Sequence, residues 1–234
     1  KEISKSQIFN MGCHHDKARN EMANRPQQPL IGDIFPNFHA ETQLGPIQLY
    51  DYMGDDWLVF FSHPKDFTPV CTTELGKVAR IKEEFDKRHT KVIALSVDDV
   101  ESHKGWIKDI EETQSCKIWY PIIADVNGSI SKQLGMIHPN SDPKVTVRNV
   151  FIVSPDKKVK LTITYPPSTG RNFDEILRVI DSLQTTSKHQ VATPEGWHPG
   201  EKVVILPVIK DEEAEKKFPQ GFDKVKPYLR YVNV

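Results

Sequence analysis

Cysteine is scarce in this chain: three residues, Cys13, Cys71 and Cys116, occur among 234. They are too few and too scattered to form a disulfide scaffold, so a reducing compartment is the simpler interpretation. No apolar run approaches the ~18 residues that a membrane-spanning helix needs, and we expect no membrane insertion. A net charge of -1 leaves no basic excess to neutralise phosphates, which argues against nucleic acid as a partner.

Several cofactor and redox motifs are also missing. The sequence has neither a Walker A motif nor a G-x-G-x-x-G spacing, so it does not indicate a nucleotide or flavin cofactor. It has no C-x-x-C pair, so ordinary dithiol exchange lacks its second sulfur. With 38% hydrophobic and 27% charged residues, the composition is that of a globular chain of one large or two modest domains.

The first 28 residues are polar and lack both helical periodicity and the apolar segment of a secretory signal. We expect residues 1–28 to be an extension and the protein to be cytoplasmic; an organellar protein whose transit peptide has been removed is the alternative. The cluster Cys13–Asp16 contains two histidines and could ligate a metal ion. It offers no second half-site, so we expect no metal there.

The chain is organised around the stretch Trp57–Phe85. Its opening, Trp57–Phe61, is an apolar run of β-branched and aromatic residues that suits a strand buried on both faces. A turn follows at Ser62–Val70, which contains two prolines. From Cys71 onward, apolar residues recur every three or four positions as far as Phe85. This spacing predicts a helix with Cys71 in its first turn.

A cysteine at the start of a helix is a candidate nucleophile. The unpaired N–H groups and the positive end of the helix dipole stabilise an anion, so the pKa of the thiol should fall below its usual value of about 8.5. Cys71 is therefore expected to be a thiolate near neutral pH. The alternative is a small apolar core residue, as most free cysteines are. The neighbours Thr72, Thr73 and Glu74 favour the reactive thiol.

Strands and helices alternate along the chain beyond this stretch. Lys91–Val97 predicts a strand that completes a right-handed βαβ unit with Trp57–Phe85. Four more strands are expected, the last two joined as a hairpin: Ile47–Tyr52, Ile118–Ile123, Val147–Val153 and Lys158–Tyr165. Further helices are expected at Val100–Glu112, which Asp98 and Asp99 can cap, at Ser129–Leu134 and at Phe173–Leu183. This order describes an α/β sandwich of the thioredoxin type.

The last fifty residues differ in character from the rest. After Gln184 the chain is rich in proline and charge, with one expected strand at Val203–Val208 and one charged helix at Asp211–Phe218. This part is too short and too polar to hold a large core alone. The predicted fold is therefore a thioredoxin-like α/β sandwich with a smaller C-terminal α+β segment.

The residues around the candidate nucleophile form a known pattern. Pro64, Thr68 and Cys71 spell P-x-x-x-T-x-x-C, and the wider SHPKDFTPVCTTELG closely resembles the peroxidatic loop of peroxiredoxins. His63 before the proline, with no later partner cysteine, resembles the 1-Cys branch of that family. The resemblance continues through RNVFIVSPDKKVKLTITYP, TGRNFDEILRVIDSLQ and VATPEGWHPGE, and covers roughly Pro29 to Val234.

The resemblance implies a thiol peroxidase that acts in antioxidant defence. Cys71 would attack hydrogen peroxide or an organic hydroperoxide and become a sulfenic acid, which an external thiol such as glutathione would reduce. No prosthetic cofactor is implied. Residues 29–186 would form the peroxidase domain. Residues 187–234 would be a dimerisation segment that packs across the partner subunit of a homodimer.

Attack on a peroxide also needs groups that stabilise the departing oxygen. The resemblance places Arg148 against Cys71, where it would stabilise the thiolate and the developing oxyanion, and Thr68 would donate to the peroxide. Glu74, one helical turn beyond the cysteine, would repel a thiolate unless it is paired. Arg148 and Arg171 are its expected partners. A solvated surface charge is the alternative for either arginine.

The loop before the helix supplies two further candidates beside the substrate. Pro64 would stiffen the loop together with Pro69, so that little ordering is needed when the substrate arrives. His63 could tune Cys71 electrostatically, help product release or receive the reductant, or it could only cap the loop by a hydrogen bond. The sequence does not choose between these roles. Glu74 and Arg171 complete the residues expected near the substrate.

The remaining histidines and tryptophans are given no chemistry. The histidines show no ligand spacing and are interpreted as surface residues: His39, His89, His103, His138, His189 and His198. The four tryptophans are expected in the core or at an interface. Cys116 is expected in a loop, where it or Cys13 could resolve the sulfenic acid only if the sulfurs approach within disulfide range. We favour reduction by an external thiol.

A phospholipase and a redox sensor are the two alternatives to the peroxidase. Some members of this branch are also phospholipases that use a serine aided by His and Asp. Here Asp56 stands in place of that serine and Tyr50 in place of the histidine, while Asp156 is retained. A carboxylate cannot perform the acyl chemistry of a serine, so we expect no lipase activity by that route. The rival from another class is a non-catalytic redox sensor or chaperone-like partner, in which oxidation of Cys71 switches an interface. A sensor needs a reactive thiol but no group equivalent to Arg148.

Overall fold

The computed structural model describes residues 28–234, and its main part is a five-stranded sheet with the strand order β5-β4-β3-β6-β7. The strands are β3 (Trp57–Ser62), β4 (Thr90–Ser96), β5 (Ile122–Ala124), β6 (Arg148–Val153) and β7 (Val159–Tyr165). Strands β3, β4 and β5 run parallel, whereas β6 is antiparallel to both β3 and β7. Every residue of the central strand β3 is buried, as its unbroken apolar run predicts.

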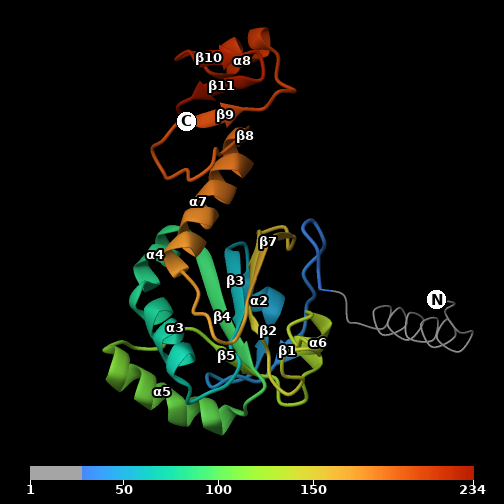
Figure 1. Cartoon of the computed structure of the whole chain (residues 1–234), viewed down its shortest axis with the longest axis vertical. Coiled ribbons are helices and arrows are strands. Elements are labelled where there is room, and N and C mark those ends of the chain that lie inside the picture. The colour runs from blue at the N-terminus through green and yellow to red at the C-terminus, as the bar shows by residue number, and fades with distance from the viewer. Residues whose placement is uncertain (1–27) are drawn as a thin grey trace, which may run out of the picture.

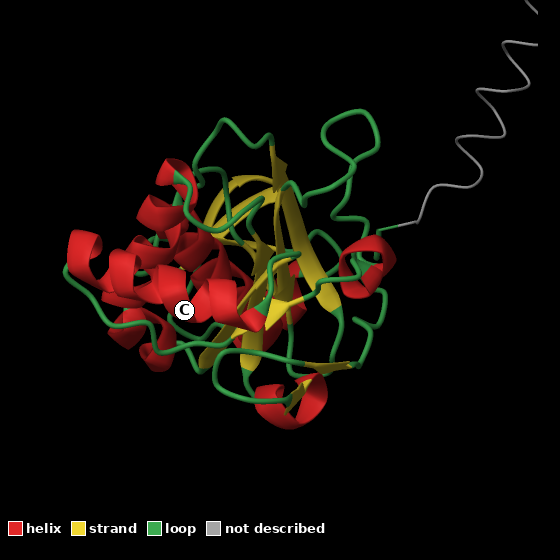
Figure 2. Cartoon of the chain, turned by 90° about the horizontal axis from the view of Figure 1, so that it is seen from below, coloured by secondary structure: helices red, strands yellow, loops and turns green. Residues whose placement is uncertain are grey.

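Helices cover both faces of this sheet. One face carries the longer helices α3 (Pro69–Arg80), α5 (Val100–Gln114) and α7 (Phe173–His189), together with α4 (Lys82–Lys87). The other face carries the short helices α2 (Leu49–Met53) and α6 (Ser129–Gln133), and a two-stranded ribbon of β1 (His39–Ala40) and β2 (Ile47–Gln48) lies near them. Figure 2 shows the larger group of helices gathered on one side of the sheet. The thioredoxin-like sandwich expected from the sequence is confirmed.

Alternate residues of each strand belong to two separate cores. On β6, Val150 and Ile152 lie in the same apolar cluster as Cys71, under helices α3, α5 and α7. Phe151 and Val153 lie in the cluster on the opposite face. Because side chains alternate along a strand, Arg148 shares the face of Val150 and therefore points toward the cysteine.

The C-terminal residues form a small sheet beyond the end of α7 (Figure 1). Its order is β10-β11-β9-β8, with the helix α8 beside it. The elements are β8 (Val191–Ala192), β9 (Val203–Ile205), α8 (Asp211–Lys217), β10 (Asp223–Lys226) and β11 (Leu229–Val232). Trp197 is 3% exposed within a separate apolar cluster there. Helix α7 continues through the expected boundary at residue 186, and the domain boundaries stay a prediction.

Two predicted elements near the site are wrong in detail. Ile47–Tyr52 is not one strand: it pairs for two residues and then turns into α2, because Leu49 and Met53, four positions apart, are both buried as one face of a helix. The helix expected to run from Cys71 to Phe85 breaks at Ile81, where φ is -101° and ψ is 27°. The apolar spacing continues across this break, and neither Gly nor Pro marks it in the sequence.

Other boundaries differ from the expectation. Strand β5 begins at Ile122 rather than Ile118, because the side chain of Gln43 binds the Tyr120 carbonyl and the Ile122 N–H before the ladder starts. Helix α7 extends to His189. The short strands β8, β10 and β11 were not expected. Between residues 28 and 234, no helix combines the length and the apolar character needed to cross a bilayer.

Candidate active site

Cys71 lies in the first turn of α3, as predicted. Thr68 is the N-cap residue with an extended backbone, Pro69 opens the helix, and Cys71 follows two positions later. Proline suits the first helical position because its missing N–H would have no acceptor there. The N–H of Cys71 also has no acceptor within the helix, so it presents a donor near the sulfur. The side chain is 0% exposed.

Hydrogen bonds to Glu74 and to the Pro167 carbonyl fix Arg148 beside the Cys71 sulfur. Its Nη1 lies 3.2 Å from Cys71 Sγ and 2.8 Å from Glu74 Oε2. Its Nε and Nη2 donate to the Pro167 carbonyl at 2.9 and 2.7 Å. The residue is 3% exposed, so its guanidinium is fixed before any substrate arrives. A fixed cation at this distance stabilises the thiolate form of Cys71.

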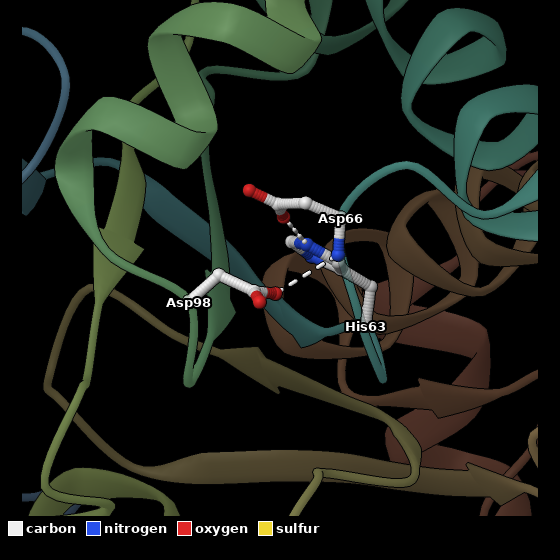
Figure 3. A group of neighbouring side chains, drawn as sticks. All are labelled: His63, Asp66 and Asp98. Atoms are coloured by element: carbon white, nitrogen blue, oxygen red, sulfur yellow. Dashed lines mark hydrogen bonds and ion pairs between the residues drawn. The ribbon is translucent and has the colours of Figure 1, made fainter.

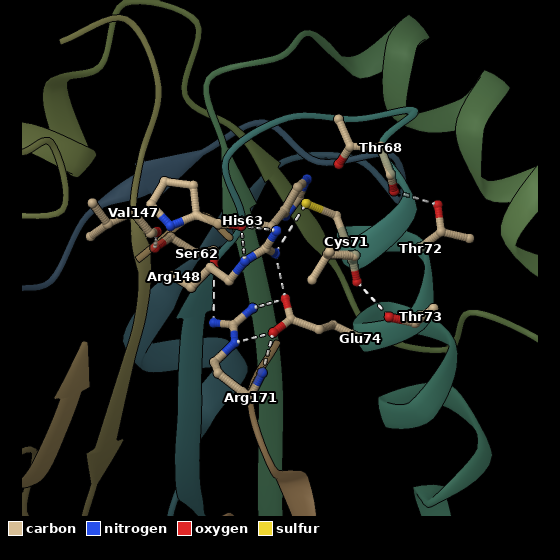
Figure 4. A network of polar contacts seen from close by, with 12 residues as sticks. Ser62, His63, Thr68, Cys71, Thr72, Thr73, Glu74, Val147, Arg148 and Arg171 are labelled. Atoms are coloured by element: carbon tan, nitrogen blue, oxygen red, sulfur yellow. Dashed lines mark hydrogen bonds and ion pairs between the residues drawn. The ribbon is translucent and has the colours of Figure 1, made fainter. Parts of the chain in front are cut away.

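Glu74 binds both arginines, as the sequence predicts (Figure 4). Arg171 donates to it from its backbone N and its Nε, at 2.7 and 2.9 Å from Oε1, and from Nη2, at 2.7 Å from Oε2. Burial alone would raise the pKa of Glu74, but the charge and hydrogen bonds of Arg171 and the charge of Arg148 outweigh it and lower the pKa. Two guanidiniums and one carboxylate leave one positive charge, which a thiolate on Cys71 neutralises.

The hydroxyl of Thr68 has a different orientation from the one expected. Its Oγ1 donates to the Lys65 carbonyl at 2.8 Å, and its own carbonyl accepts from the Thr72 hydroxyl at 2.8 Å. A threonine hydroxyl has a single hydrogen, and the Lys65 carbonyl already accepts it. The Thr68 oxygen can therefore offer a ligand only a lone pair. In this arrangement it would accept a hydrogen bond from the peroxide O–H rather than donate one.

His63 is fully buried and belongs to a polar network inside the loop. Its Nε2 lies 2.8 Å from Asp66 Oδ1, and its ring packs at a tilt of 42° against Trp106, with the centroids 5.1 Å apart. Pro64, beside it, is also buried. Burial lowers the pKa of His63, and the hydrogen bond and charge of Asp66 offset only part of that effect. The hydrogen bond to Asp66 agrees with a role in holding the loop together.

His103 is not a surface residue, and that prediction is wrong. It is 0% exposed, with Nδ1 2.6 Å from Asp66 Oδ2 and Nε2 3.2 Å from the Ile123 carbonyl. Burial alone would raise the pKa of Asp66, but hydrogen bonds from His103 and His63 outweigh it and hold the pKa well below its usual value. Two buried imidazoles therefore share one carboxylate.

Helix α5 contributes side chains to the site that were not predicted from the sequence. Trp106 donates from Nε1 to the Thr72 hydroxyl at 3.1 Å and so joins α5 to the first turn of α3. His103, Trp106 and Ile110 are the buried residues of α5, spaced by three and four positions. This period could have identified His103 as an inward residue, because it lies on the same face as the two apolar side chains.

One group within residues 28–234 has donor atoms close enough to be considered for a metal ion. Ligand atoms of His63, Asp66 and Asp98 lie within 4.8 Å of one another (Figure 3). Asp66 Oδ1 is bound to His63, while Asp98 Oδ2 accepts from the Asp66 N–H at 2.9 Å and the Ser96 hydroxyl at 3.0 Å. These hydrogen bonds engage both carboxylates and His63 Nε2, while His63 Nδ1 has no partner among the described residues. The Cys13–Asp16 cluster lies outside the described residues.

Cys116 follows the end of α5 and forms no disulfide with Cys71. Both cysteines are free thiols, and burial raises the pKa of the Cys116 thiol. Arg80, at the end of α3, donates to the carbonyl of Gln114, two residues before Cys116. From Cys71 to Arg80 the helix rises by about 13 Å. A disulfide needs Cα atoms about 4.4–6.8 Å apart. In this fold the Cys116 thiol instead contacts the Ile110 carbonyl, with Sγ 3.9 Å from the oxygen.

The residues weighed for a lipase site lie at the other end of β3. Asp56 precedes this strand, whereas the cysteine loop follows it. The Tyr50 hydroxyl donates to the Phe35 carbonyl at 2.6 Å, and Asp156 accepts from Ser154. Asp56 lies 3.5 Å from the Lys91 ammonium. None of these contacts joins Asp56 to Tyr50 or to Asp156, and the absence of lipase activity stays a prediction.

Comparison with known proteins places these features in a family. The model of the AhpC/TSA family matches residues 31–162, and the model of the C-terminal domain of 1-Cys peroxiredoxin matches residues 182–221. A 1-Cys peroxiredoxin of Dictyostelium discoideum is 50% identical over 229 residues, which cover 98% of this chain and 95% of that protein. Peroxiredoxin-6 of Bos taurus is 54% identical over 215 residues, covering 86% of this chain and 96% of that protein.

A solved structure of a 1-Cys peroxiredoxin is also similar to this chain. Yeast mitochondrial 1-Cys peroxiredoxin, described for its thiol resolving mechanism via glutathione/thioredoxin systems, matches with a TM-score of 0.83 and 47% identity, covering 88% of this chain and 99% of that one. The matches extend over both the main sheet and the C-terminal residues. With a buried cysteine held by an arginine at a helix start and such relatives along nearly its whole length, the chain belongs to the 1-Cys peroxiredoxins, a family of thiol peroxidases.

Proposed function

We propose that Cys71 is the peroxidatic cysteine of this thiol peroxidase and that Arg148 and Thr68 act with it on the hydroperoxide. The Cys71 thiolate attacks the terminal oxygen of R–O–O–H, an S–O bond forms and the O–O bond breaks. The departing R–O⁻ takes up one proton, which gives Cys71–S–O–H and R–O–H. R is hydrogen for hydrogen peroxide and carbon for an organic hydroperoxide.

The observation that carries this proposal is the position of Arg148. Its Nη1 contacts both the sulfur and Glu74, and its other nitrogens are tied to the Pro167 carbonyl. A preorganised cation beside the reacting sulfur stabilises the thiolate and the charge that develops as the O–O bond breaks. Thr68 supplies a hydroxyl oxygen that can orient the peroxide O–H. Pro64, Glu74 and Arg171 shape the same site without reacting, as does His63.

We infer that the sulfenic acid is reduced by an external thiol, through a mixed disulfide. The Cys116 thiol contacts the Ile110 carbonyl, 3.9 Å away, and the Cys71 sulfur is contacted by Arg148, which supports an external donor. The yeast relative is described with glutathione/thioredoxin systems. Glutathione or a thioredoxin is therefore the reductant to test. No prosthetic cofactor takes part in this scheme.

We also propose that the protein is a homodimer of the cytoplasm in which residues 187–234 contact the partner subunit. Several large apolar side chains of this region are exposed, among them Val208 at 80% and Tyr228 at 67%. Exposed apolar groups of this size favour an interface.

The test is stopped-flow tryptophan fluorescence of the reduced protein mixed with hydrogen peroxide. Trp106 is the reporter, because its indole binds the Thr72 hydroxyl beside Cys71. We expect a fast phase whose rate rises linearly with peroxide concentration. Cys71→Ser should abolish this phase and Cys116→Ser should leave it unchanged. A wild-type rate no faster than that of an ordinary free thiol would remove the assignment.

A redox sensor is the second candidate, and Arg148 separates the two. A sensor needs only a reactive thiol, whereas a peroxidase also needs leaving-group stabilisation. Arg148→Ala should slow the peroxide reaction by about 10²–10³-fold in the peroxidase, because it removes a fixed donor and cation from the transition state. Arg148→Lys should retain part of the rate, since it keeps the charge without the planar fork. A rate unchanged in both variants would favour the sensor.

A further inference from the structure

The hydrogen bonds among His63, Asp66 and His103 determine which of the ring nitrogens carry a hydrogen. Asp66 Oδ2 receives His103 Nδ1 at 2.6 Å and the Ser102 hydroxyl at 2.9 Å, while Oδ1 faces His63 Nε2. An ionised carboxylate only accepts hydrogen bonds, so each of these three partners must donate. His63 therefore carries its hydrogen on Nε2 and His103 carries one on Nδ1.

The other nitrogen of His103, Nε2, also faces a hydrogen-bond acceptor. Its Nε2 lies 3.2 Å from the Ile123 carbonyl, which is also an acceptor. Both nitrogens of His103 face acceptors, so the geometry calls for a hydrogen on each, which makes the ring an imidazolium. This cation and the Asp66 carboxylate are both buried and neutralise each other. The charge of His103 therefore opposes the effect of the Asp66 charge on His63.

His63 is left with one free nitrogen in the interior. Its Nδ1 is buried and has no hydrogen-bond partner among the described residues. A second hydrogen there would make His63 a cation beside the His103 cation, which repulsion and burial both oppose. The other charged groups around His63 are Asp98, which is engaged with the Asp66 N–H and Ser96, and Arg148, which is paired with the Cys71 sulfur in the same site (Figure 4). The Nδ1 lone pair is therefore free.

The free nitrogen is part of a side chain that lies close to Cys71. The His63 ring packs against Trp106, and the same indole donates to the hydroxyl of Thr72, the residue after Cys71. In the close view of the site, His63 lies in the group of side chains around the sulfur and Arg148 (Figure 4). A hydroxyl brought into this site can donate to Nδ1, and both a hydroperoxide and a sulfenic acid carry one.

We propose that His103, with Ser102, acts through Asp66 as a positioning residue that keeps His63 in its Nε2–H tautomer, with an unprotonated Nδ1 available to accept a hydrogen bond from a hydroxyl in the peroxidatic site. Helix α5 thereby supplies the charge that keeps His63 neutral. The hydroxyl-accepting role rests on the proposed function, whereas the tautomer does not.

The first experiment observes the imidazoles directly, by ¹⁵N NMR of the reduced protein labelled at histidine. We expect His63 to show an unprotonated Nδ1 and a protonated Nε2 near neutral pH, and His103 to show hydrogen on both nitrogens. Hydrogen on Nδ1 of His63, or a neutral His103, in the wild-type protein would overturn the proposal. This readout does not depend on peroxide.

The second experiment changes the charge that α5 supplies. His103→Asn keeps an N–H near Asp66 but removes the cation, so His63 should become the partner cation and its titration midpoint should rise by about one pH unit or more. Ser102→Ala, which alters the core less, should shift it in the same direction by a smaller amount. Glu101→Gln is the matched control, because Glu101 is exposed on the same helix and pairs with Lys104. An unchanged midpoint in both Ser102→Ala and His103→Asn would overturn the proposal.

The third experiment links the tautomer to the reaction. The rate constant for peroxide in His103→Asn, divided by that of the wild type, should fall as pH drops from about 8 to about 6, because Nδ1 becomes protonated in the variant alone. A merely structural effect would lower this ratio equally at every pH, and that result would overturn the accepting role. A wild-type protein that does not react with peroxide would instead contradict the proposed function, while the NMR result would still decide the tautomer.

Discussion

Glu74 is the residue on which both arginines of the site converge. It is 3% exposed and receives donors from Arg148 and from the backbone and side chain of Arg171. A buried carboxylate in this position sets the geometry of both guanidiniums and balances one of their charges. Its removal would leave two buried cations with less than their full compensation.

Glu74→Gln should therefore destabilise the reduced protein by about 3–5 kcal/mol, the usual effect of breaking a buried ion pair from one side. Urea unfolding followed by far-UV circular dichroism measures this change. Glu175→Gln is the matched control, because Glu175 pairs with Arg178 on the surface and should lose at most about 1 kcal/mol. Equal losses in the two variants would contradict the importance of the buried pair.

Acid should destabilise the fold in two stages. The folded pKa of His63 is lowered by burial below its usual value, so the unfolded chain binds a proton that the folded chain does not. The contribution of His63 is complete above about pH 6.5 and declines as pH falls below it. The pKa values of Asp66 and Glu74 are also lowered, so their contributions decline only below about pH 4.5.

The measurement for this prediction is the free energy of unfolding between about pH 7.5 and pH 3.5. We expect the loss to begin near pH 6.5, before any carboxylate titrates. His63→Gln should remove the first stage and keep the second. A wild-type curve that stays flat down to about pH 5 would contradict the prediction for His63.

At the scale of the elements, the site depends on the close approach of α3 and α5. Gly76 of α3 lies against Gln114 of α5, where an added Cβ would come within 2.4 Å of the Gln114 Cγ. Arg80 and Trp106 hold the same two helices together by hydrogen bonds. The position of His103, on α5, is therefore set partly by the small size of a residue on α3.

Gly76→Ala should destabilise the protein by about 1–3 kcal/mol, because α5 must move away to admit the methyl group. Gly105→Ala is the matched control within a helix: its added Cβ would meet only the Phe67 ring, at 3.4 Å. This second change should be neutral or stabilising, by up to about 1 kcal/mol. Thermal unfolding compares the two, and a Gly76→Ala protein as stable as Gly105→Ala would contradict the argument.

At the scale of the whole molecule, the C-terminal residues stand apart from the main sheet. They have a small apolar cluster of their own and are joined to the sandwich by α7 (Figure 1). Val208, Val225 and Tyr228 are large apolar residues exposed by 80%, 58% and 67%. A unit of this kind gains most from a second surface that covers those side chains.

Sedimentation of the full chain should give the mass of a dimer at micromolar concentration. Val208→Glu combined with Tyr228→Glu should shift the equilibrium toward monomer, since it would bury two charges at the interface. Val126→Glu, at a side chain 66% exposed elsewhere on the surface, should leave the mass unchanged. A monomeric wild type, or equal masses for all three proteins, would contradict the proposed assembly.

Most of the main sheet and the start of the key helix could be predicted from the sequence. Trp57–Phe61 and Lys91–Val97 are long apolar runs without competing signals, and the turn before Cys71 is marked by prolines. The pairing of Glu74 with both arginines was also expected. These features are local, or rest on a spacing that one helix or one strand imposes.

What could not be predicted depends on contacts between distant elements. His103 is polar, and although the helical period of α5 places it on the inward face, its contact with Asp66, 37 residues away, is not visible in the sequence. The hydrogen of Thr68 is directed by the Lys65 carbonyl, which the spacing of the motif does not show. Ile47–Tyr52 alternates like a strand, but the burial of Leu49 and Met53 selects a helix. Tertiary contacts decide each of these cases.

The pairing of β6 with β3 has a consequence for how this protein can vary. The ladder matches Phe61 with Val150, so one register brings the end of β3, where the cysteine loop starts, and the beginning of β6 to the same edge. A single insertion or deletion within Arg148–Val153 would turn the arginine to the opposite face of the sheet and exchange the two cores. Length changes should therefore be tolerated in the exposed segment at residues 139–144, whereas within β6 each would remove the cation and the packing together.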